Sequence, residues 1–117
     1  MDAFQLPQLI AQRQQSGKLY LEFLRATTMS VGLYALPAGG TDPQQPHTED
    51  EAYYVVSGRG AIRVGAEDRA VEPGSLVFVK AGVEHRFHTI AEDLTLLVFF
   101  APAEYSLSTD GTDFLSV

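Results

Sequence analysis

Three side chains of this sequence are of types that bind transition metals, and they lie in two separate segments. His47 and Glu51 stand just before the apolar run Ala52-Tyr53-Tyr54-Val55-Val56, and His85 stands in a later segment. Two imidazoles and a carboxylate, brought from different strands to one interior point, are ligands that suit a divalent transition metal. These residues therefore indicate a metal site, provided that the fold brings them together.

The elements that must position these residues are short strands. Residues 18–25 alternate between apolar and polar side chains, the period of two that is typical of a half-buried strand. Turn residues separate further runs of this kind, and we interpret one such pair, Arg59-Gly60, as a hairpin turn. The predicted strands are residues 18–25, 28–36, 51–57, 61–64, 69–72, 75–80, 85–90 and 94–101. About eight short strands at regular spacing indicate an antiparallel sandwich or barrel.

The two ends of the chain differ from this pattern. Residues 7–15 are predicted to form a short helix with Pro7 in its first turn, ended by Ser16-Gly17, and this helix is expected to cover a barrel end or a partner subunit. Residues 105–117 carry no strong signal. With no linker and no internal repeat, residues 1–117 are expected to form a single domain with a barrel core at about 18–103.

Composition excludes several classes of function. The net charge of -7, from 15 acidic and 8 basic residues, argues against a surface that binds nucleic acid or an anionic membrane. The absence of cysteine excludes disulfides, thiolate zinc sites and cysteine nucleophiles. The N-terminal segment does not have the pattern of a signal peptide, and no apolar stretch approaches ~20 residues. A cytoplasmic, unprocessed protein is expected.

Two groups of residues resemble the sequence motifs of the cupin superfamily. The first group is Gly39, Gln45, His47, Glu51 and Gly58, and the second is Gly74, Lys80, Gly82, His85 and Thr89. The resemblance covers residues 28–101. Gln45 stands where a histidine is usual, Lys80 replaces a proline, and Thr89 replaces an asparagine. The resemblance implies an all-β fold, an antiparallel double-stranded β-helix or jelly-roll barrel, here with a short N-terminal helix.

Strand geometry selects the metal ligands within such a barrel. Alternate residues of a strand face the same side, so Glu51 and His85 can reach a common interior point, and His47 approaches Glu51 with the same parity. We expect His47, Glu51 and His85 to bind one divalent transition metal ion, with Gln45 as a fourth, weaker ligand through its amide oxygen. Zinc and iron are the first candidates, and manganese and nickel also fit. A similar Gln, His, Glu, His set occurs in zinc-dependent phosphomannose isomerases, which are cupins.

Aromatic residues are expected around this site. Tyr34, Tyr53, Phe78, Phe87 and Phe99 can line an apolar cavity that limits the access of water, or form a plain aromatic core. His88 has the opposite parity to His85 and is expected to face outward.

The cupin resemblance leaves three functions open. The first is a small metal-dependent enzyme, of the Lewis-acid isomerase or the dioxygenase type, that acts on a small oxygenated metabolite. The second is a non-catalytic cupin that binds a sugar or another metabolite and keeps a structural metal. The third is a metal-free structural barrel. In the first two cases the partner is a small-molecule ligand. Because cupins commonly pair, and because residues 94–101 are apolar at nearly every position, a homodimer is expected.

Overall fold

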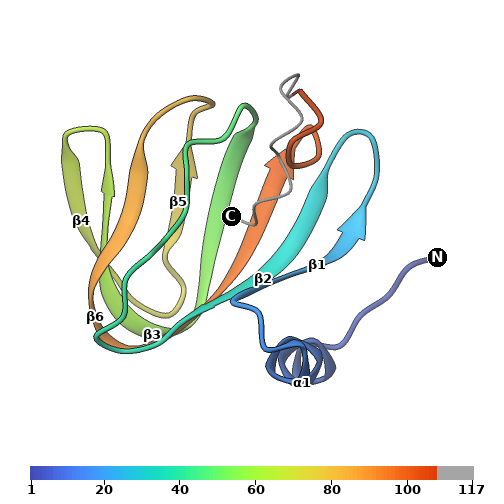
Figure 1. Ribbon diagram of the computed structural model, residues 1–117, viewed down its shortest axis with the longest axis horizontal. Coiled ribbons are helices and arrows are strands. Elements are labelled where there is room, and N and C mark those ends of the chain that lie inside the picture. The colour runs from blue at the N-terminus through green and yellow to red at the C-terminus, as the bar shows by residue number, and fades with distance from the viewer. Residues whose placement is uncertain (108–117) are drawn as a thin grey trace.

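The computed structural model describes residues 1–107, which form one antiparallel sheet that curls into an open barrel with a helix at one end (Figure 1). The elements are α1 (Leu6–Ser16), β1 (Tyr20–Arg25), β2 (Ser30–Leu36), β3 (Asp50–Val64), β4 (Glu67–Val71), β5 (Leu76–Val79) and β6 (His85–Ala101). The strand order is β1-β2-β6-β3-β4, and β5 pairs with β3. The predicted all-β antiparallel fold with a short N-terminal helix is confirmed. Of the C-terminal stretch without a predicted element, residues 108–117 lie outside the described residues.

Two long strands, β3 and β6, each span two of the strands predicted from the sequence. They run antiparallel over most of their length, from the pair Glu51 and Phe100 to the pair Val64 and His85. The pairing shifts register between Val55 and Ala61, as β-bulges do where a strand bends. The predicted hairpin turn at Arg59-Gly60 is therefore wrong. The chain bends there without reversing its direction, so β3 continues as one strand through both halves of the barrel.

Gly58 permits the close approach of β3 and β6 at this bend. Its φ is +93°, in the left-handed region that glycine adopts without steric cost. A Cβ atom added at this position would lie 2.1 Å from the carbonyl oxygen of Asp93 on β6. Glycine is thus required at position 58 by the bulge and by the close approach of the β6 backbone.

The interior of the barrel is filled by the inward-facing side chains of the strands. In β3 the residues Glu51, Tyr53 and Val55 are buried, whereas Tyr54 between them is exposed, as the predicted period of two requires. The larger cluster comprises Tyr34, Leu36, Tyr53, Val55, Ile62, Phe87, Ile90, Leu94, Leu96, Val98 and Phe100, among others. A carboxylate on the same face of β3 as these residues, that of Glu51, is consequently placed inside the barrel.

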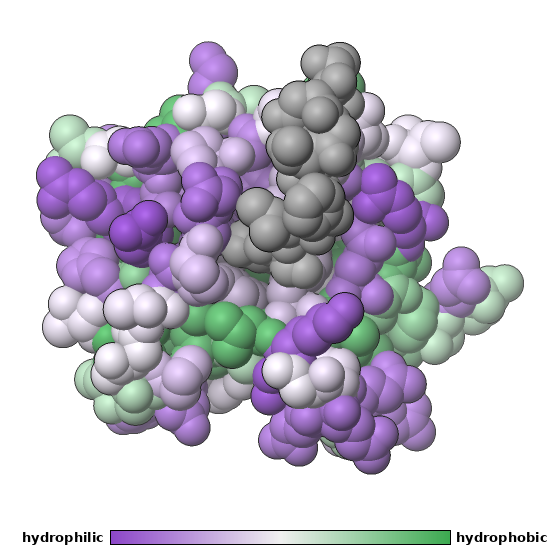
Figure 2. All heavy atoms as spheres, viewed as in Figure 1, coloured by the Kyte–Doolittle hydropathy of each residue, from purple (hydrophilic) through white to green (hydrophobic). Residues whose placement is uncertain are grey.

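Helix α1 lies below the strands in Figure 1 and packs against β1 and β2. Leu9 is its buried residue, and the helix ends at Gly17, which has a φ of +70°. Figure 2 shows hydrophilic side chains over α1 and a band of hydrophobic surface between the helix and the upper part of the same face. Within residues 1–107, no helix is long and apolar enough to cross a membrane.

After β6 the chain folds back over β2 and the segment before β3, at the top of Figure 1. The backbone N–H of Glu104 donates to Ser30 Oγ at 2.8 Å, and Arg25 Nη2 donates to the carbonyl of Glu104 at 2.9 Å. The Glu49 carboxylate accepts the N–H groups of Tyr105 and Leu107 at 2.7 and 3.0 Å. These contacts bury Glu104 beside the barrel interior.

Candidate metal centre

The structure brings His47, Glu51 and His85 together in the interior of the barrel. All three are buried, and one ligand atom from each lies within 4.8 Å of the others. Glu51 Oε1 is 2.9 Å from His85 Nε2 and 3.5 Å from His47 Nδ1. His47 comes from the segment before β3, Glu51 from the start of β3, and His85 from the start of β6. Three chain segments therefore converge on one point.

The amide next to this cluster belongs to Gln44 and not to Gln45. Gln45 is exposed, whereas Gln44 is buried. Gln44 Oε1 accepts a hydrogen bond from the Tyr53 hydroxyl at 2.6 Å and lies 3.0 Å from His85 Nε2. The interpretation of Gln45 as a fourth ligand is corrected accordingly, because the irregular segment before His47 does not keep the two-residue period of a strand.

Asp42 fixes the conformation of that segment. Its carboxylate accepts hydrogen bonds from the Tyr34 hydroxyl at 2.5 Å and from the Phe87 backbone N–H at 2.9 Å. It also accepts from the backbone N–H of Gln44 at 3.3 Å and from the Gln44 side-chain amide. Asp42 thus connects β2, β6 and the segment before β3, and it orients the Gln44 side chain toward His85.

Hydrogen bonds to the far side of each imidazole orient the two histidines. His85 Nδ1 lies 2.9 Å from the carbonyl oxygen of Val83, and His47 Nε2 lies 2.9 Å from Glu104 Oε2. A carbonyl oxygen and an ionised carboxylate only accept, so these two nitrogens carry the hydrogens. In the neutral rings, the lone pairs then reside on His85 Nε2 and His47 Nδ1, the two atoms that face Glu51. Metal-binding histidines are held in the same way by acceptors behind the ring.

Three of the atoms that face the common point lack hydrogen-bond partners among the described residues. Among residues 1–107, His47 Nδ1 and both carboxylate oxygens of Glu51 are buried and accept no well-aligned hydrogen bond. Lone pairs that face one another are costly to bury, so the arrangement suits a cation between them, either a proton or a metal ion. Two imidazoles and a carboxylate fit a divalent transition metal.

The ionisable groups of the site have shifted pKa values. Burial lowers the pKa of His85, but the contact with Glu51 and its negative charge outweigh burial and raise that pKa above its ordinary value. Burial, followed by the charge of Glu51, raises the pKa of Tyr53 well above that of free tyrosine. Burial also raises the pKa of Glu104, against the opposing effect of His47. In this site Tyr53 consequently keeps its proton.

The aromatic residues predicted to line the site are divided by the structure. Tyr34, Tyr53 and Phe87 lie in the buried interior. The expectation for Phe78 and Phe99 is wrong. Phe78 is 64% exposed on β5, and Phe99 lies opposite Ala52, on the outward face of β6. Phe100 takes the inner position, with its ring centroid 4.6 Å from that of His47. Around both residues the strands are apolar on both faces, so the sequence shows no alternation from which the inward-facing side chains could be predicted.

Four buried polar residues around the cluster were not found from the sequence: Asp42, Gln44, Glu49 and Glu104. Asp42 and Gln44 lie in an irregular segment without periodicity, and Glu49 stands among other acidic residues. Glu104 contacts His47 across a separation of 57 positions in the chain, and no local sequence pattern predicts such a contact.

A cavity of about 310 Å³ opens beside the cluster. It lies between residues 44–46 and the adjoining ends of β3 and β6, and His85 forms part of its wall. Arg63 and Arg86 line it as well. The metal centre therefore has a neighbouring space that can accept a small molecule.

Comparisons with known proteins agree with this architecture. Residues 32–100 match the family model described as "Cupin domain". The "Uncharacterized protein SCO3923" of Streptomyces coelicolor is 58% identical over 104 residues, which are 89% of this chain and 99% of that protein. The crystal structure of TT1209 from Thermus thermophilus has a TM-score of 0.71 and 28% identity, over 88% of this chain and 99% of that one. The DMSP lyase DddQ from Ruegeria pomeroyi has a TM-score of 0.63 and 25% identity, over 72% of this chain but only 42% of that one.

Proposed function

The chain belongs to the cupin family, and we propose that it is a small metal-dependent enzyme in which His47, Glu51 and His85 bind one divalent transition metal ion. The observation that carries this proposal is the convergence of buried, unpartnered acceptors on a single point. A metal ion bound there with open coordination positions would supply Lewis-acid chemistry, polarising a carbonyl or lowering the pKa of a water molecule.

Tyr53 is a titratable residue beside the candidate metal ligands. Its hydroxyl lies 3.0 Å from His85 Nε2, and its raised pKa keeps it protonated. Because this hydroxyl also donates to Gln44 Oε1 at 2.6 Å and holds its proton tightly, its expected role is to position neighbouring groups by hydrogen bonding and not to transfer a proton. One structural neighbour is a lyase by name, which supports a catalytic use of this fold although fold alone does not decide function.

A dioxygenase is the second candidate. Two histidines and one carboxylate with open positions are the ligand set of non-haem iron oxygenases. The bound metal separates the two candidates, because oxygen chemistry of this kind needs a redox-active metal such as iron, whereas Lewis-acid chemistry also proceeds with redox-inert zinc. Retention of zinc by the natively purified protein would favour the isomerase type.

The test is elemental analysis of protein purified without a nickel column. We expect about one transition metal ion per chain in the wild type, and loss of that metal in the variants His47→Ala and His85→Ala. His88→Ala is the matched control, since His88 is partly exposed and lies 2.6 Å from Asp68 on the surface. Full metal content in both cluster variants would rule out this ligand set. Metal binding without turnover of any small oxygenated metabolite would favour the non-catalytic alternative.

The proposed protein partner is a second copy of the chain. Leu76 and Phe78 of β5 are 75% and 64% exposed, and the partly exposed Tyr54 of β3 lies opposite Leu76. An exposed apolar sheet face of this kind favours burial against another subunit. We expect a particle of twice the chain mass in analytical ultracentrifugation, converted to a monomer by Phe78→Ser. A monomer in the wild type would contradict this part of the proposal.

A further inference from the structure

We propose that the cavity beside His85 binds the carboxylate group of a small anionic substrate, and that Arg86 is its principal anchor with Arg63 in support. This inference rests on the proposed function, because it names the class of substrate that the metal centre would receive. It does not depend on which metal is bound.

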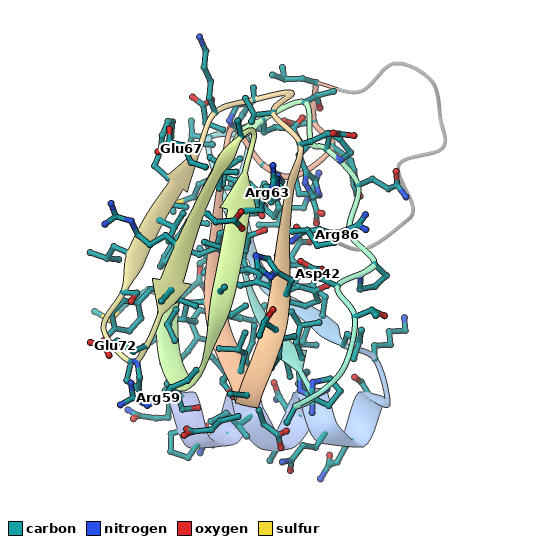
Figure 3. All side chains as sticks on the ribbon, turned by 90° about the vertical axis from the view of Figure 1, so that its left-hand side faces the viewer. Asp42, Arg59, Arg63, Glu67, Glu72 and Arg86 are labelled. Carbon is teal, nitrogen blue, oxygen red and sulfur yellow. The ribbon has the colours of Figure 1, made fainter. Side chains whose placement is uncertain are left out.

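The two arginines are placed directly opposite each other on neighbouring strands. Arg63 of β3 and Arg86 of β6 are register partners, and both line the cavity. Like charges directly opposite each other destabilise an antiparallel pair unless a counter-charge lies near them. Figure 3 shows the two residues near each other in its upper half, on the side of the segment that carries Asp42. A bound anion would relieve their repulsion.

Only one of these two guanidinium groups is neutralised by the protein. Arg63 Nη1 donates to Asp68 Oδ2 at 2.9 Å. Within the described part of the chain, Arg86 makes no side-chain hydrogen bond and no ion pair. Its five N–H donors, arranged as a planar fork, remain available to a ligand. Arg86 therefore offers the geometry that binds a carboxylate through two parallel hydrogen bonds.

The rest of the cavity is compatible with an anion of small size. Glu84 also lines the wall, but within residues 1–107 its carboxylate forms no ion pair with either arginine. The volume of about 310 Å³ lies at the lower end for small-molecule sites. In a protein with a net charge of -7, attraction of an anion requires such a local pair of cations.

The same cavity borders the metal centre at His85. His85 and Gln44 form part of its wall, and His85 Nε2 is the atom that faces Glu51. A small molecule whose carboxylate is held by Arg86 would extend from the rim toward His85. The arginine pair would thereby orient the other end of the substrate toward His85 and Gln44, which contact Glu51 and Tyr53 respectively.

The experiment is calorimetric titration of the zinc-loaded protein with malonate as the probe. Malonamide serves as the uncharged probe and inorganic phosphate as the competing anion. We expect Arg86→Gln to weaken malonate binding by about tenfold or more, since charge-assisted bidentate hydrogen bonds are lost. Arg63→Gln should weaken it less. Arg59→Gln is the matched control: Arg59 pairs with Glu72 at 2.9 Å and lies near the bottom of Figure 3, away from the cavity.

Three results would overturn the inference: no malonate binding, equal weakening by Arg86→Gln and Arg59→Gln, or tighter binding of phosphate or malonamide than of malonate. Elemental analysis of the same samples separates this inference from the metal proposal. If metal is present and malonate fails to bind, only the anion site is wrong. If malonate binds through Arg86 to protein that retains no metal, the anion site stands and the metal proposal fails.

Discussion

His47 and Glu104 are hydrogen-bonded across 2.9 Å, although 57 positions separate them in the chain. Both residues are buried, and the contact lies on the side of the imidazole ring opposite Glu51. An acceptor behind a metal-binding histidine fixes its tautomer and increases its basicity. The segment that follows the last strand is therefore part of the candidate site.

Replacement of Glu104 by glutamine should weaken metal binding. Glu104→Gln removes the charge that holds the Nε2 proton of His47, and loss of such a partner typically costs ~10- to 100-fold in metal affinity. Competition with a chromophoric chelator measures this affinity. Glu92→Gln, at an exposed position, is the control and should leave the affinity unchanged. Equal affinities in wild type and Glu104→Gln would show that Glu104 has only a packing role.

The two neighbouring glutamines should respond differently to substitution. Gln44→Ala removes the oxygen that accepts from the buried Tyr53 hydroxyl and one of the donors to the Asp42 carboxylate, at a cost of about 1–3 kcal/mol in the free energy of unfolding. Gln45→Ala, at an exposed position, should change it by less than about 0.5 kcal/mol. Urea unfolding of the metal-free proteins measures both values. A larger destabilisation by Gln45→Ala than by Gln44→Ala would indicate that Gln45, and not Gln44, belongs to the site.

Removal of the metal should lower the melting temperature of the wild type. A ligand that binds only the folded state stabilises it by mass action, and at 100 times the dissociation constant this amounts to about 2.7 kcal/mol, or roughly 10 °C in a domain of this size. Differential scanning calorimetry with and without EDTA measures the shift. The variant His85→Ala should show none. An unchanged wild-type melting temperature would support the metal-free structural barrel.

Two glycines with positive φ should differ in their tolerance of alanine. At Gly58 a Cβ would lie 2.1 Å from the Asp93 oxygen, so Gly58→Ala must displace β6 and should destabilise by more than about 3 kcal/mol. At Gly39, where φ is +72°, a Cβ meets no described atom within 4 Å, and the cost should be only the ~1–2 kcal/mol of the left-handed backbone. Chemical denaturation compares the two variants. Similar losses would mean that the strands separate easily at the bulge.

Asparagine at position 89 should stabilise the protein. Thr89 has a φ of +49°, a backbone conformation that a β-branched residue adopts at a cost and that asparagine tolerates. Thr89→Asn is expected to add about 1 kcal/mol to the free energy of unfolding. Thermal and urea unfolding at neutral pH test this expectation. A loss of stability would instead assign a structural role to the contact of Thr89 Oγ1 with His88 Nδ1, which are 2.9 Å apart.

The strands and the inner face of β3 were predictable because their side chains alternate. Glu51 and Tyr53 share parity, and so do His85 and Phe87, and all four are buried. The bend near Gly58 was not predictable, because turns and bulges both use glycine at positive φ. Strand β5, which contains Phe78, and the end of β6 around Phe99 are apolar on both faces, so hydrophobicity did not reveal which side faces inward.

The surroundings of the cluster were less predictable than the cluster itself. The segment that contains Gln44 and Gln45 is irregular, and its path depends on hydrogen bonds between Asp42 and distant residues such as Phe87. Glu104 reaches His47 only after the chain has folded back across the barrel. Such contacts depend on tertiary structure, and local sequence patterns carry no information about them.

The positions of Tyr53 and Tyr105 make the intrinsic tyrosine fluorescence of the protein sensitive to metal binding. The chain has no tryptophan, so its ultraviolet emission comes from five tyrosines. Tyr53 has its hydroxyl 3.0 Å from His85 Nε2, and the Tyr105 ring lies 5.3 Å from that of His47. An open-shell ion such as cobalt would quench the fluorescence of both rings, whereas zinc would not. Occupancy of the centre is thus measurable in the unlabelled protein.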